Sequence, residues 1–385
     1  MPFLPFLRKG RGSSEARSSE AKKEVVEEVA QRQQPQPTAG LVEGPLVIAF
    51  SSTKGGCGKS LLATGSAFIA SAAGEKVLIV DLDITNMTAT MITIGSLGMR
   101  SEELYSRIYK SVVDIKRFSS VGLLKESLKI LQAMEQNKRL VITKEIGGPP
   151  FVRSDVHGLF IPAPGTEHRE PVPLAYLGDI YFIPAAPLSI AEFERERFFD
   201  MPADELNEQV AAMVQVLRKI AGELGITRVF IDLPPTDRLK IHKPSYKWIQ
   251  VAAEKSDTVF LVTEYVSSGE VTPAEIIGFV GSFRGFDGIV ERSGGIIVNK
   301  VDPSILSGSD GFTSTSIYSF LGRGFPKASS AGKIYAVPYD PSWSEYKQYT
   351  SRQIHPIFIM FRGAGAALTK ILLREGVITR VPGSR

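Results

Sequence analysis

Short runs rich in β-branched residues recur along this chain and alternate with longer amphipathic stretches. The runs are Leu46–Ser51, Lys76–Asp81, Asp179–Ala185, Arg228–Asp232, Thr258–Glu264, Gly295–Lys300 and Ile334–Pro338. Nearly continuous apolar strands that are separated by helices form a parallel sheet with helices on both faces. Helices are expected most clearly over Leu61–Ala73, Ala203–Leu224 and Ile357–Arg374. The sequence therefore predicts a doubly wound, mainly parallel α/β fold.

The two ends of the 385-residue chain depart from this alternation. Residues 1–45 are charged and poor in large apolar side chains, so they cannot bury enough surface to offset their ordering entropy. We expect a disordered tail there, a main domain over residues 46–375, and a short C-terminal tail over 376–385.

Residues 91–177 form a second departure, because they are too many for a structureless loop inside a compact domain. We expect a partly helical inserted subdomain over this stretch. Its helices are predicted at Glu102–Arg117 and Leu123–Glu135, followed by irregular Pro- and Gly-rich chain from Gly147 to Pro173.

Composition excludes several classes of protein. The formal net charge is only +4, which is too mild to indicate a nucleic-acid partner by itself. The single cysteine, Cys57, excludes an intramolecular disulfide and a zinc or iron–sulfur site built from one chain's thiolates. The opening MPFLPFLRKG reaches charge too early for a signal peptide, so a cytoplasmic protein is expected.

A glycine-rich segment, Ser52–Ser60 (STKGGCGKS), directly follows the first run and precedes a helix. Glycines there let backbone N–H groups converge on phosphate oxygens, Lys59 reaches the phosphates, and the Ser60 hydroxyl ligates Mg²⁺. Such a string can also be an ordinary turn, but the flanking strand and helix favour a phosphate cradle. The residues expected to hold the nucleotide are Gly55, Gly56, Cys57, Gly58, Lys59, Ser60 and Leu61. For Cys57, a small inert side chain is favoured over a redox switch.

The loop resembles the deviant KGGxGK[ST] signature of the ParA/MinD family of P-loop ATPases, which Lys54–Ser60 matches in full. Other motifs of that family follow in the same order. They are KVLIVDLD (Lys76–Asp83), similar to switch I, VFIDLPP (Val229–Pro235), similar to switch II, and Ile296–Asn299 with Val337–Pro338, similar to the base pocket. The resemblance covers about Leu46–Ile92 and Leu177–Leu373 and implies a P-loop NTPase fold.

The resemblance also implies roles for single residues. Lys54 would reach the nucleotide of the other subunit in an ATP-sandwich homodimer, and Asp83 would orient and activate the attacking water. Asp81 and Asp232 would hold the Mg²⁺ shell through waters. Asn299 and Pro338 would bind the base. The alternative for Lys54 is an exposed loop lysine, and for each aspartate it is a cap of the turn that follows its strand.

Two positions depart from the usual pattern. Ile84-Thr85 stand where ParA proteins usually have Pro-Gln, which is closer to the MinD-like branch. Asn299-Lys300-Val301-Asp302 reads as the N-K-x-D pattern that recognises guanine. ATP is therefore favoured, and GTP remains an alternative.

By this resemblance the chain would be a Mg²⁺-dependent ATPase that an activating protein partner stimulates. As a nucleotide switch it would position or partition DNA, a membrane-associated machine or a protein complex, peripherally at the nucleoid or membrane. One alternative is a client-delivery or assembly factor, using ATP or GTP, whose insertion binds a protein. Another is a small-molecule synthetase on the same fold.

Three surfaces could meet a partner. Phe3–Leu7 with the basic residues after it could anchor weakly to a membrane, or could be an ordinary disordered start. A basic C-terminal face could bind DNA non-specifically, although a solvated surface of mixed charge is favoured. Its residues are Arg323, Lys327, Lys333, Lys347, Arg352, Arg362, Lys370 and Arg374. An acidic partner could dock on the cluster after switch II, formed by Arg238, Lys240, His242, Lys243 and Lys247.

Overall fold

The computed structural model describes part of the chain. The described residues are 44–83, 86–95, 120–137, 156–159, 174–177, 180–185, 202–236, 247–265, 273–306, 316–341, 343 and 363–382. The chain divides into two units, Met1–Leu41 and Val42–Arg385, and all described residues belong to the second unit. The predicted tail up to residue 43 and the predicted helix Glu102–Arg117 lie outside the described residues.

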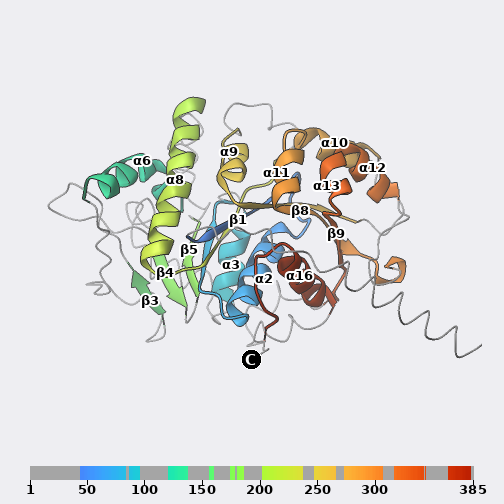
Figure 1. The fold of residues 1–385 in the computed structure, drawn as a ribbon, viewed down its shortest axis with the longest axis horizontal. Coiled ribbons are helices and arrows are strands. Elements are labelled where there is room, and N and C mark those ends of the chain that lie inside the picture. Colours follow the sequence, from blue (N-terminus) through green and yellow to red (C-terminus); the bar gives the residue numbers. More distant parts are fainter. Residues whose placement is uncertain are drawn as a thin grey trace, which may run out of the picture. The chain divides into compact units, whose positions relative to one another are not determined.

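A nine-stranded sheet forms the centre of the second unit (Figure 1). Its strands are β1 (Leu46–Ser52), β2 (Val77–Asp81), β3 (Val156–Leu159), β4 (Leu174–Leu177), β5 (Ile180–Ile183), β6 (Arg228–Asp232), β7 (Thr258–Glu264), β8 (Gly294–Val301) and β9 (Ile334–Pro338). They lie in the order β3-β4-β5-β2-β6-β1-β7-β8-β9. All pairs from β5 to β9 are parallel, whereas β3 and β4 add two antiparallel pairs beside β5.

The predicted doubly wound, mainly parallel fold is confirmed. Each predicted run coincides with one parallel strand, with bounds that differ by no more than two residues. Two strands, β3 and β4, were missed, because β3 lies in the stretch that the sequence marks as irregular and β4 directly follows that stretch. Each is only four residues long, and the two pair with each other antiparallel, so they leave little periodic signal.

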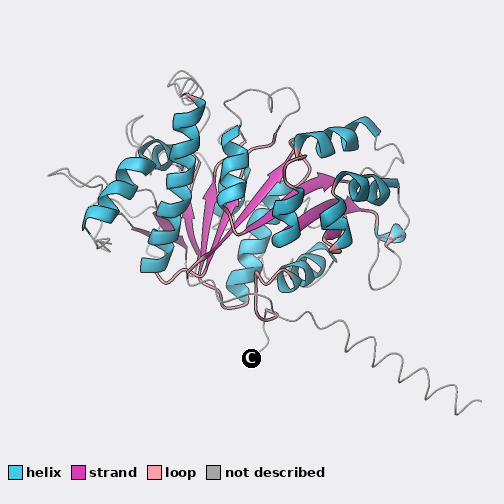
Figure 2. Ribbon diagram, turned by 45° about the horizontal axis from the view of Figure 1, so that its top comes forward, coloured by secondary structure: helices cyan, strands magenta, loops and turns pink. Residues whose placement is uncertain are grey.

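Helices cover both faces of the sheet (Figure 2). On one face lie α2 (Lys59–Ala72), α3 (Thr88–Gly95) and α16 (Gly363–Arg374). The other face carries α6 (Ser120–Asn137), α8 (Ala203–Glu223), α9 (Lys247–Lys255), α10 (Pro273–Ser282), α11 (Asp287–Arg292), α12 (Ser316–Gly324) and α13 (Pro326–Ser330). A 3-10 turn, η2, spans Pro303–Ile305. The predicted helices correspond to α2, α8 and α16, although residues 357–362 lie outside the described part.

Side-chain alternation along β1 links the two hydrophobic cores. Val47 and Ala49 belong to the core under α8 and α9, whereas Ile48 and Phe50 belong to the core under α2 and α16. Successive strand residues point to opposite faces, so a strand buried on both sides must be apolar throughout. This is why the runs in the sequence read as continuous rather than alternating.

Described parts of the predicted insertion join the main core and sheet. Helix α6, which contains the predicted helix Leu123–Glu135, places Leu123 and Leu124 in the same hydrophobic cluster as Leu206 of α8. The backbone N–H of Leu128 also donates to Gln209 Oε1 at 3.0 Å. Strands β3 and β4 extend the sheet next to β5.

Parallel strands bring the polar ends of five runs to one edge of the sheet. The strand register sets Asp81 beside Asp232 and Glu264 beside Asn299. Strand β1, which the glycine-rich loop follows, lies between β6 and β7 near the middle of the sheet. Ligands of open α/β sheets bind at this carboxyl edge, where neighbouring connections diverge.

Candidate functional site

The glycine-rich loop connects β1 to α2. Gly56 and Gly58 have positive φ angles of 86° and 90°, which side chains with a Cβ rarely adopt. A Cβ on Gly58 would also overlap the side-chain amide of Asn299. Helix α2 begins at Lys59, directly after Gly58. Its first N–H groups therefore lie at the loop, as a phosphate cradle requires.

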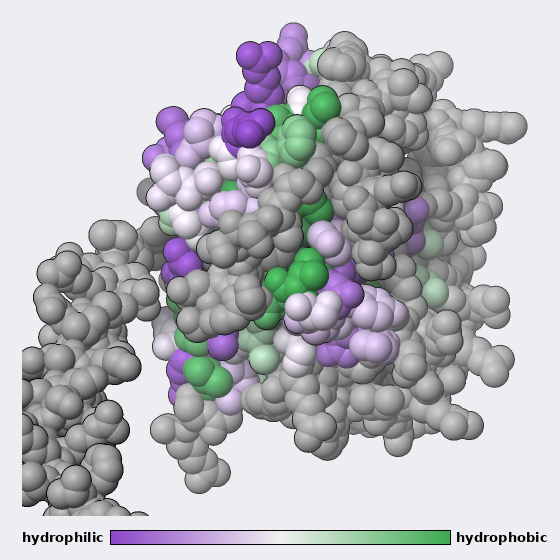
Figure 3. Space-filling view, turned by 90° about the vertical axis from the view of Figure 1, so that its right-hand side faces the viewer, coloured by the Kyte–Doolittle hydropathy of each residue, from purple (hydrophilic) through white to green (hydrophobic). Residues whose placement is uncertain are grey.

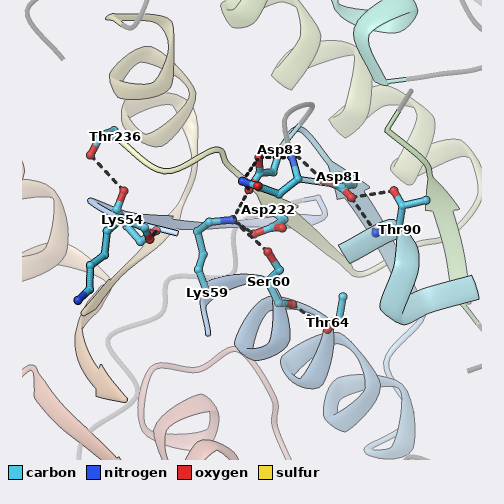
Figure 4. Close-up of polar contacts among 11 residues, drawn as sticks. Lys54, Lys59, Ser60, Thr64, Asp81, Asp83, Thr90, Asp232 and Thr236 are labelled. Atoms are coloured by element: carbon cyan, nitrogen blue, oxygen red, sulfur yellow. Dashed lines mark hydrogen bonds and ion pairs between the residues drawn. The ribbon is translucent and has the colours of Figure 1, made fainter. Parts of the chain in front are cut away.

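Lys59 lies at the centre of a buried polar cluster (Figure 4). Its Nζ donates to Asp232 Oδ1 at 2.5 Å, to Ser60 Oγ at 3.2 Å and to Asp83 Oδ2 at 3.4 Å. The side chain is only 4% exposed. Burial by itself lowers the pKa of Lys59, but the negative charges of Asp232 and Asp83 outweigh burial and raise that pKa. Lys59 therefore stays charged.

Burial and crowding shift the pKa of two aspartates in this cluster, Asp81 and Asp232. Burial, together with the charges of Asp232 and Asp83, raises the pKa of Asp81 to about 8. Burial also raises the pKa of Asp232, although Lys59 opposes that rise. One ammonium thus faces more carboxylate charge than it can balance, and a divalent cation would restore the balance.

Asp81 accepts hydrogen bonds from the segment that follows β2. Its Oδ2 accepts from the backbone N–H and the hydroxyl of Thr90, both at 2.7 Å, and its Oδ1 accepts from the backbone N–H of Asp83 at 3.0 Å. The Thr90 hydroxyl oxygen in turn accepts from the N–H of Ala185 at 2.9 Å. Asp81 thereby links α3 and the segment after β5 to β2.

Asp232 differs because one of its oxygens is uncommitted. Oδ1 pairs with Lys59, whereas Oδ2 is buried and has no hydrogen-bond partner among the described residues. The neighbouring Ser60 hydroxyl adds a second hard oxygen, and Mg²⁺ takes oxygen ligands, often only one or two from protein. Among the described residues, no group of three or more His, Cys, Asp or Glu side chains is arranged to hold a metal ion. The donor set therefore fits Mg²⁺ held together with phosphates and waters.

Lys54 lies apart from this cluster and points away from it (Figure 4). Its Nζ pairs with Glu264 Oε1 at 2.6 Å, and the side chain remains 40% exposed. The other oxygen of Glu264 pairs with Lys300 at 2.7 Å, and Lys300 Nζ also donates to the carbonyl of Gly56 at 2.7 Å. Reasoning from sequence missed Glu264, although a carboxylate at the end of an apolar strand was a usable signal.

Asn299 and Lys300 both bind the glycine-rich loop. The Asn299 side-chain amide donates to the carbonyl of Cys57 at 2.8 Å. Asp302, the last residue of the N-K-x-D string, instead accepts from the N–H and hydroxyl of Ser304 at 2.9 and 2.7 Å and caps η2. Asn299 lines the cavity beside the loop, and Asp302 is not among its lining residues.

A cavity of about 300 Å³ connects these groups. The loop residues from Lys54 to Leu61, Asp83, Asn299, Lys300 and Pro338 line it. Two wall residues that the sequence did not single out are Tyr339, which is 45% exposed, and the buried Trp343. Cys57 is buried, and burial raises the pKa of its thiol, which disfavours the reactive thiolate.

The sequence that builds this site matches the model of a known protein family. The CobQ/CobB/MinD/ParA nucleotide binding domain matches residues 48–321, which is more than half of the chain. The chain belongs to this family. The family match includes the glycine-rich loop and all three aspartates, whereas β9 and α16 lie beyond it.

The solved structures that resemble this chain have low sequence identity to it and TM-scores below 0.5. A complex of an McdA variant with ATP, from Cyanothece, is 14% identical, covers 88% of this chain and 98% of its own, and has a TM-score of 0.49. A chain of the MinC:MinD cell division protein complex from Aquifex aeolicus is 17% identical, covers 89% of this chain and 99% of its own, and has a TM-score of 0.48. MinD with Mg-ADP from Pyrococcus horikoshii OT3 is 14% identical, covers 86% and 95%, and has a TM-score of 0.42. No curated protein matches the chain in sequence. Membership of the CobQ/CobB/MinD/ParA family therefore rests on the family model.

Proposed function

We propose that this chain is a Mg²⁺-dependent ATPase that forms an ATP-sandwich homodimer and acts as a nucleotide switch. The switch would position DNA, a membrane-associated machine or a protein complex. The observation that carries the proposal is the Lys59 cluster, in which one buried ammonium contacts Asp232, Asp83 and Ser60 beside the glycine-rich loop. Phosphoryl transfer needs positioning and charge neutralisation, and these groups can provide both.

Within one subunit, the loop N–H groups and Lys59 would bind the phosphates. Ser60 and Asp232 would hold Mg²⁺, which neutralises phosphate charge when bound. Asp83 would orient the attacking water. Its carboxylate is fixed by Asn86, whose side-chain amide donates to both oxygens at 3.2 and 3.3 Å. For Asp81 we propose the positioning of Asp83 and α3, because its oxygens already accept three hydrogen bonds.

Lys54 would serve the nucleotide of a second subunit. Its side chain is partly exposed and directed away from Lys59 and the aspartates of its own subunit, which supports a role across an interface. ATP is proposed over GTP because Asp302, the residue that would read guanine, caps η2 outside the cavity.

The predicted basic residues are candidates for the surface that the switch would engage. Of the predicted basic C-terminal residues, Lys347, Arg352 and Arg362 lie outside the described residues, as do four of the five in the cluster after switch II. Lys327 pairs with Glu291, and Lys333 pairs with Glu375. Hydrophilic and hydrophobic residues are interspersed on this side of the molecule, in the described part of the face (Figure 3). No helix in the described part of the chain is long and apolar enough to cross a membrane.

The test combines hydrolysis with self-association. Purified protein should hydrolyse ATP faster than GTP, should lose activity in EDTA, and should sediment as a dimer with ATP and as a monomer with ADP. Asp83→Ala should bind ATP and trap the dimer, and Lys54→Ala should abolish it. Co-sedimentation of the ATP and ADP states with DNA and with anionic liposomes then identifies the surface. If both variants hydrolyse like wild type as monomers, the sandwich mechanism is wrong.

A further inference from the structure

Glu264 ties two lysines together beside the glycine-rich loop. It ends β7, which lies between β1 and β8, and its register partner on β8 is Asn299. Oε1 accepts from Lys54 at 2.6 Å, and Oε2 accepts from Lys300 at 2.7 Å. The carboxylate therefore links the first part of the loop to the end of β8.

The backbone conformation at Lys300 directs its side chain toward Glu264. Strand β8 has a bulge between Val298 and Val301, and Lys300 within it has a positive φ of 59°. Bulges redirect side chains, and a non-glycine residue in this conformation is strained. The redirected ammonium bridges Glu264 and the carbonyl of Gly56. Glu264 is thus anchored to the loop through Lys300 independently of Lys54.

The two side chains of the Lys54–Glu264 pair differ in their exposure to solvent. The Glu264 side chain is 16% exposed, whereas that of Lys54 is 40% exposed. Partial burial alone would raise the pKa of Glu264, but hydrogen bonds from Lys300 and Lys54 lower it, so the carboxylate is ionised at neutral pH. If the pair opens, Glu264 keeps its ion pair with Lys300.

We infer that Glu264 is a positioning residue that holds Lys54 on its own subunit until the phosphates of a second subunit compete for that ammonium. This inference rests on the proposed sandwich dimer. A carboxylate and a phosphate are alternative partners for one ammonium, so the ion pair opposes premature association. Removing the charge of Glu264 should therefore favour the dimer, whereas a residue needed only for the fold would weaken it.

The first test measures Lys54 itself in nucleotide-free protein. Acetic anhydride modifies the neutral amine, and a neighbouring carboxylate favours the unreactive ammonium. Glu264→Gln should raise the acetylation rate of Lys54 about two- to fivefold, measured by peptide mass spectrometry, since a half-exposed pair contributes up to about 1 kcal/mol. Glu291→Gln, which removes the Lys327–Glu291 pair of 3.5 Å, is the matched control and should leave Lys54 unchanged. An unchanged or slower rate in Glu264→Gln would overturn the inference.

The second test measures association. In sedimentation equilibrium with ATP, Glu264→Gln should dimerise at about two- to fivefold lower protein concentration than wild type. Lys300→Met, which removes the other arm, should not reproduce this gain, and Lys54→Ala/Glu264→Gln should lose it. A wild-type dimer that needs Lys54 but is unchanged or weakened by Glu264→Gln overturns the inference and leaves the proposed function intact. If wild type does not dimerise with ATP, the proposed function fails, and the inference fails with it.

Discussion

Two lysines of the same loop, Lys54 and Lys59, lie in opposite environments. Lys59 is buried among Asp232, Asp83 and Ser60, on the side of the loop that faces β6 and β2. Lys54 is partly exposed and pairs with Glu264 on the β7 side. A buried ammonium that balances several carboxylates cannot leave without a large cost, whereas an exposed one can exchange partners cheaply. The contrast suggests that Lys59 serves its own subunit and that Lys54 serves another.

The largest expected effect tests the buried side. Lys59→Ala leaves Asp232 and Asp83 without their cation and should lower the free energy of unfolding by about 3–5 kcal/mol, besides abolishing nucleotide binding. Lys54→Ala removes a half-exposed pair, and Glu264 keeps Lys300 as a partner, so this variant should lower the free energy of unfolding by less than about 1 kcal/mol. Urea denaturation of the nucleotide-free proteins at pH 7 measures both values. Equal losses would remove the distinction between the two lysines.

Asp232 and Asp81 sharpen the comparison within the buried cluster. Asp232→Asn should weaken the Mg²⁺-dependent part of nucleotide affinity by about 10–100-fold, because Asp232 Oδ2 is the uncommitted oxygen. Thr90→Val removes the hydroxyl that Asp81 and Ala185 share, and should instead lower stability by about 1–3 kcal/mol. Isothermal titration across a Mg²⁺ series, paired with denaturation curves, separates the two outcomes. Similar Mg²⁺ dependence in Asp232→Asn and wild type would contradict the assignment.

The loop between the lysines gives a smaller effect. Gly58→Ala forces a Cβ into a left-handed conformation against the Asn299 amide and should destabilise the nucleotide-free protein by about 1–2 kcal/mol or more. Gly55→Ala is the matched control, because its Cβ would meet no atom within 4 Å. Adding Asn299→Ala to Gly58→Ala should recover part of the loss. Thermal denaturation that ranks Gly55→Ala and Gly58→Ala equally would refute this account of the loop.

The smallest effect concerns Cys57. Burial raises the pKa of its thiol, so raising the pH to 8.5 should generate little thiolate in the folded protein. Iodoacetamide should therefore label Cys57 slowly at pH 7 and at pH 8.5, and rapidly in urea. Fast labelling of folded protein that increases with pH would revive the redox alternative.

Sequence reasoning reached the fold because it depended on local patterns. Apolar runs such as Arg228–Asp232 and Thr258–Glu264 coincide with their strands because burial on both faces requires continuous apolar residues. The four-residue strands β3 and β4 were missed because their pairing with each other depends on a neighbouring strand rather than on periodicity. The domain boundaries that the sequence suggests remain predictions.

For the site, the sequence located the loop and the aspartates, whose chemical roles remain predictions. It could not foresee which side chains share a partner. Lys54 and Glu264 are far apart in sequence and meet only because β7 lies next to β1. Likewise, the N-K-x-D string resembles a guanine reader, but a bulge turns Lys300 toward the loop and Asp302 caps η2. The Lys54–Glu264 pair and the contacts of the N-K-x-D string both depend on how the strands are placed in three dimensions.

The central claim is that Lys59 and Asp83 act on the nucleotide of their own subunit while Lys54 acts on the nucleotide of the partner. Mixing Lys54→Ala with Asp83→Ala tests this claim most directly, because a mixed dimer would contain one site with Lys59, Asp83 and a Lys54 supplied across the interface. We predict that the mixture hydrolyses ATP faster than the sum of the two variants measured separately. Hydrolysis equal to that sum, under conditions where mixed dimers are demonstrated by sedimentation, would contradict it.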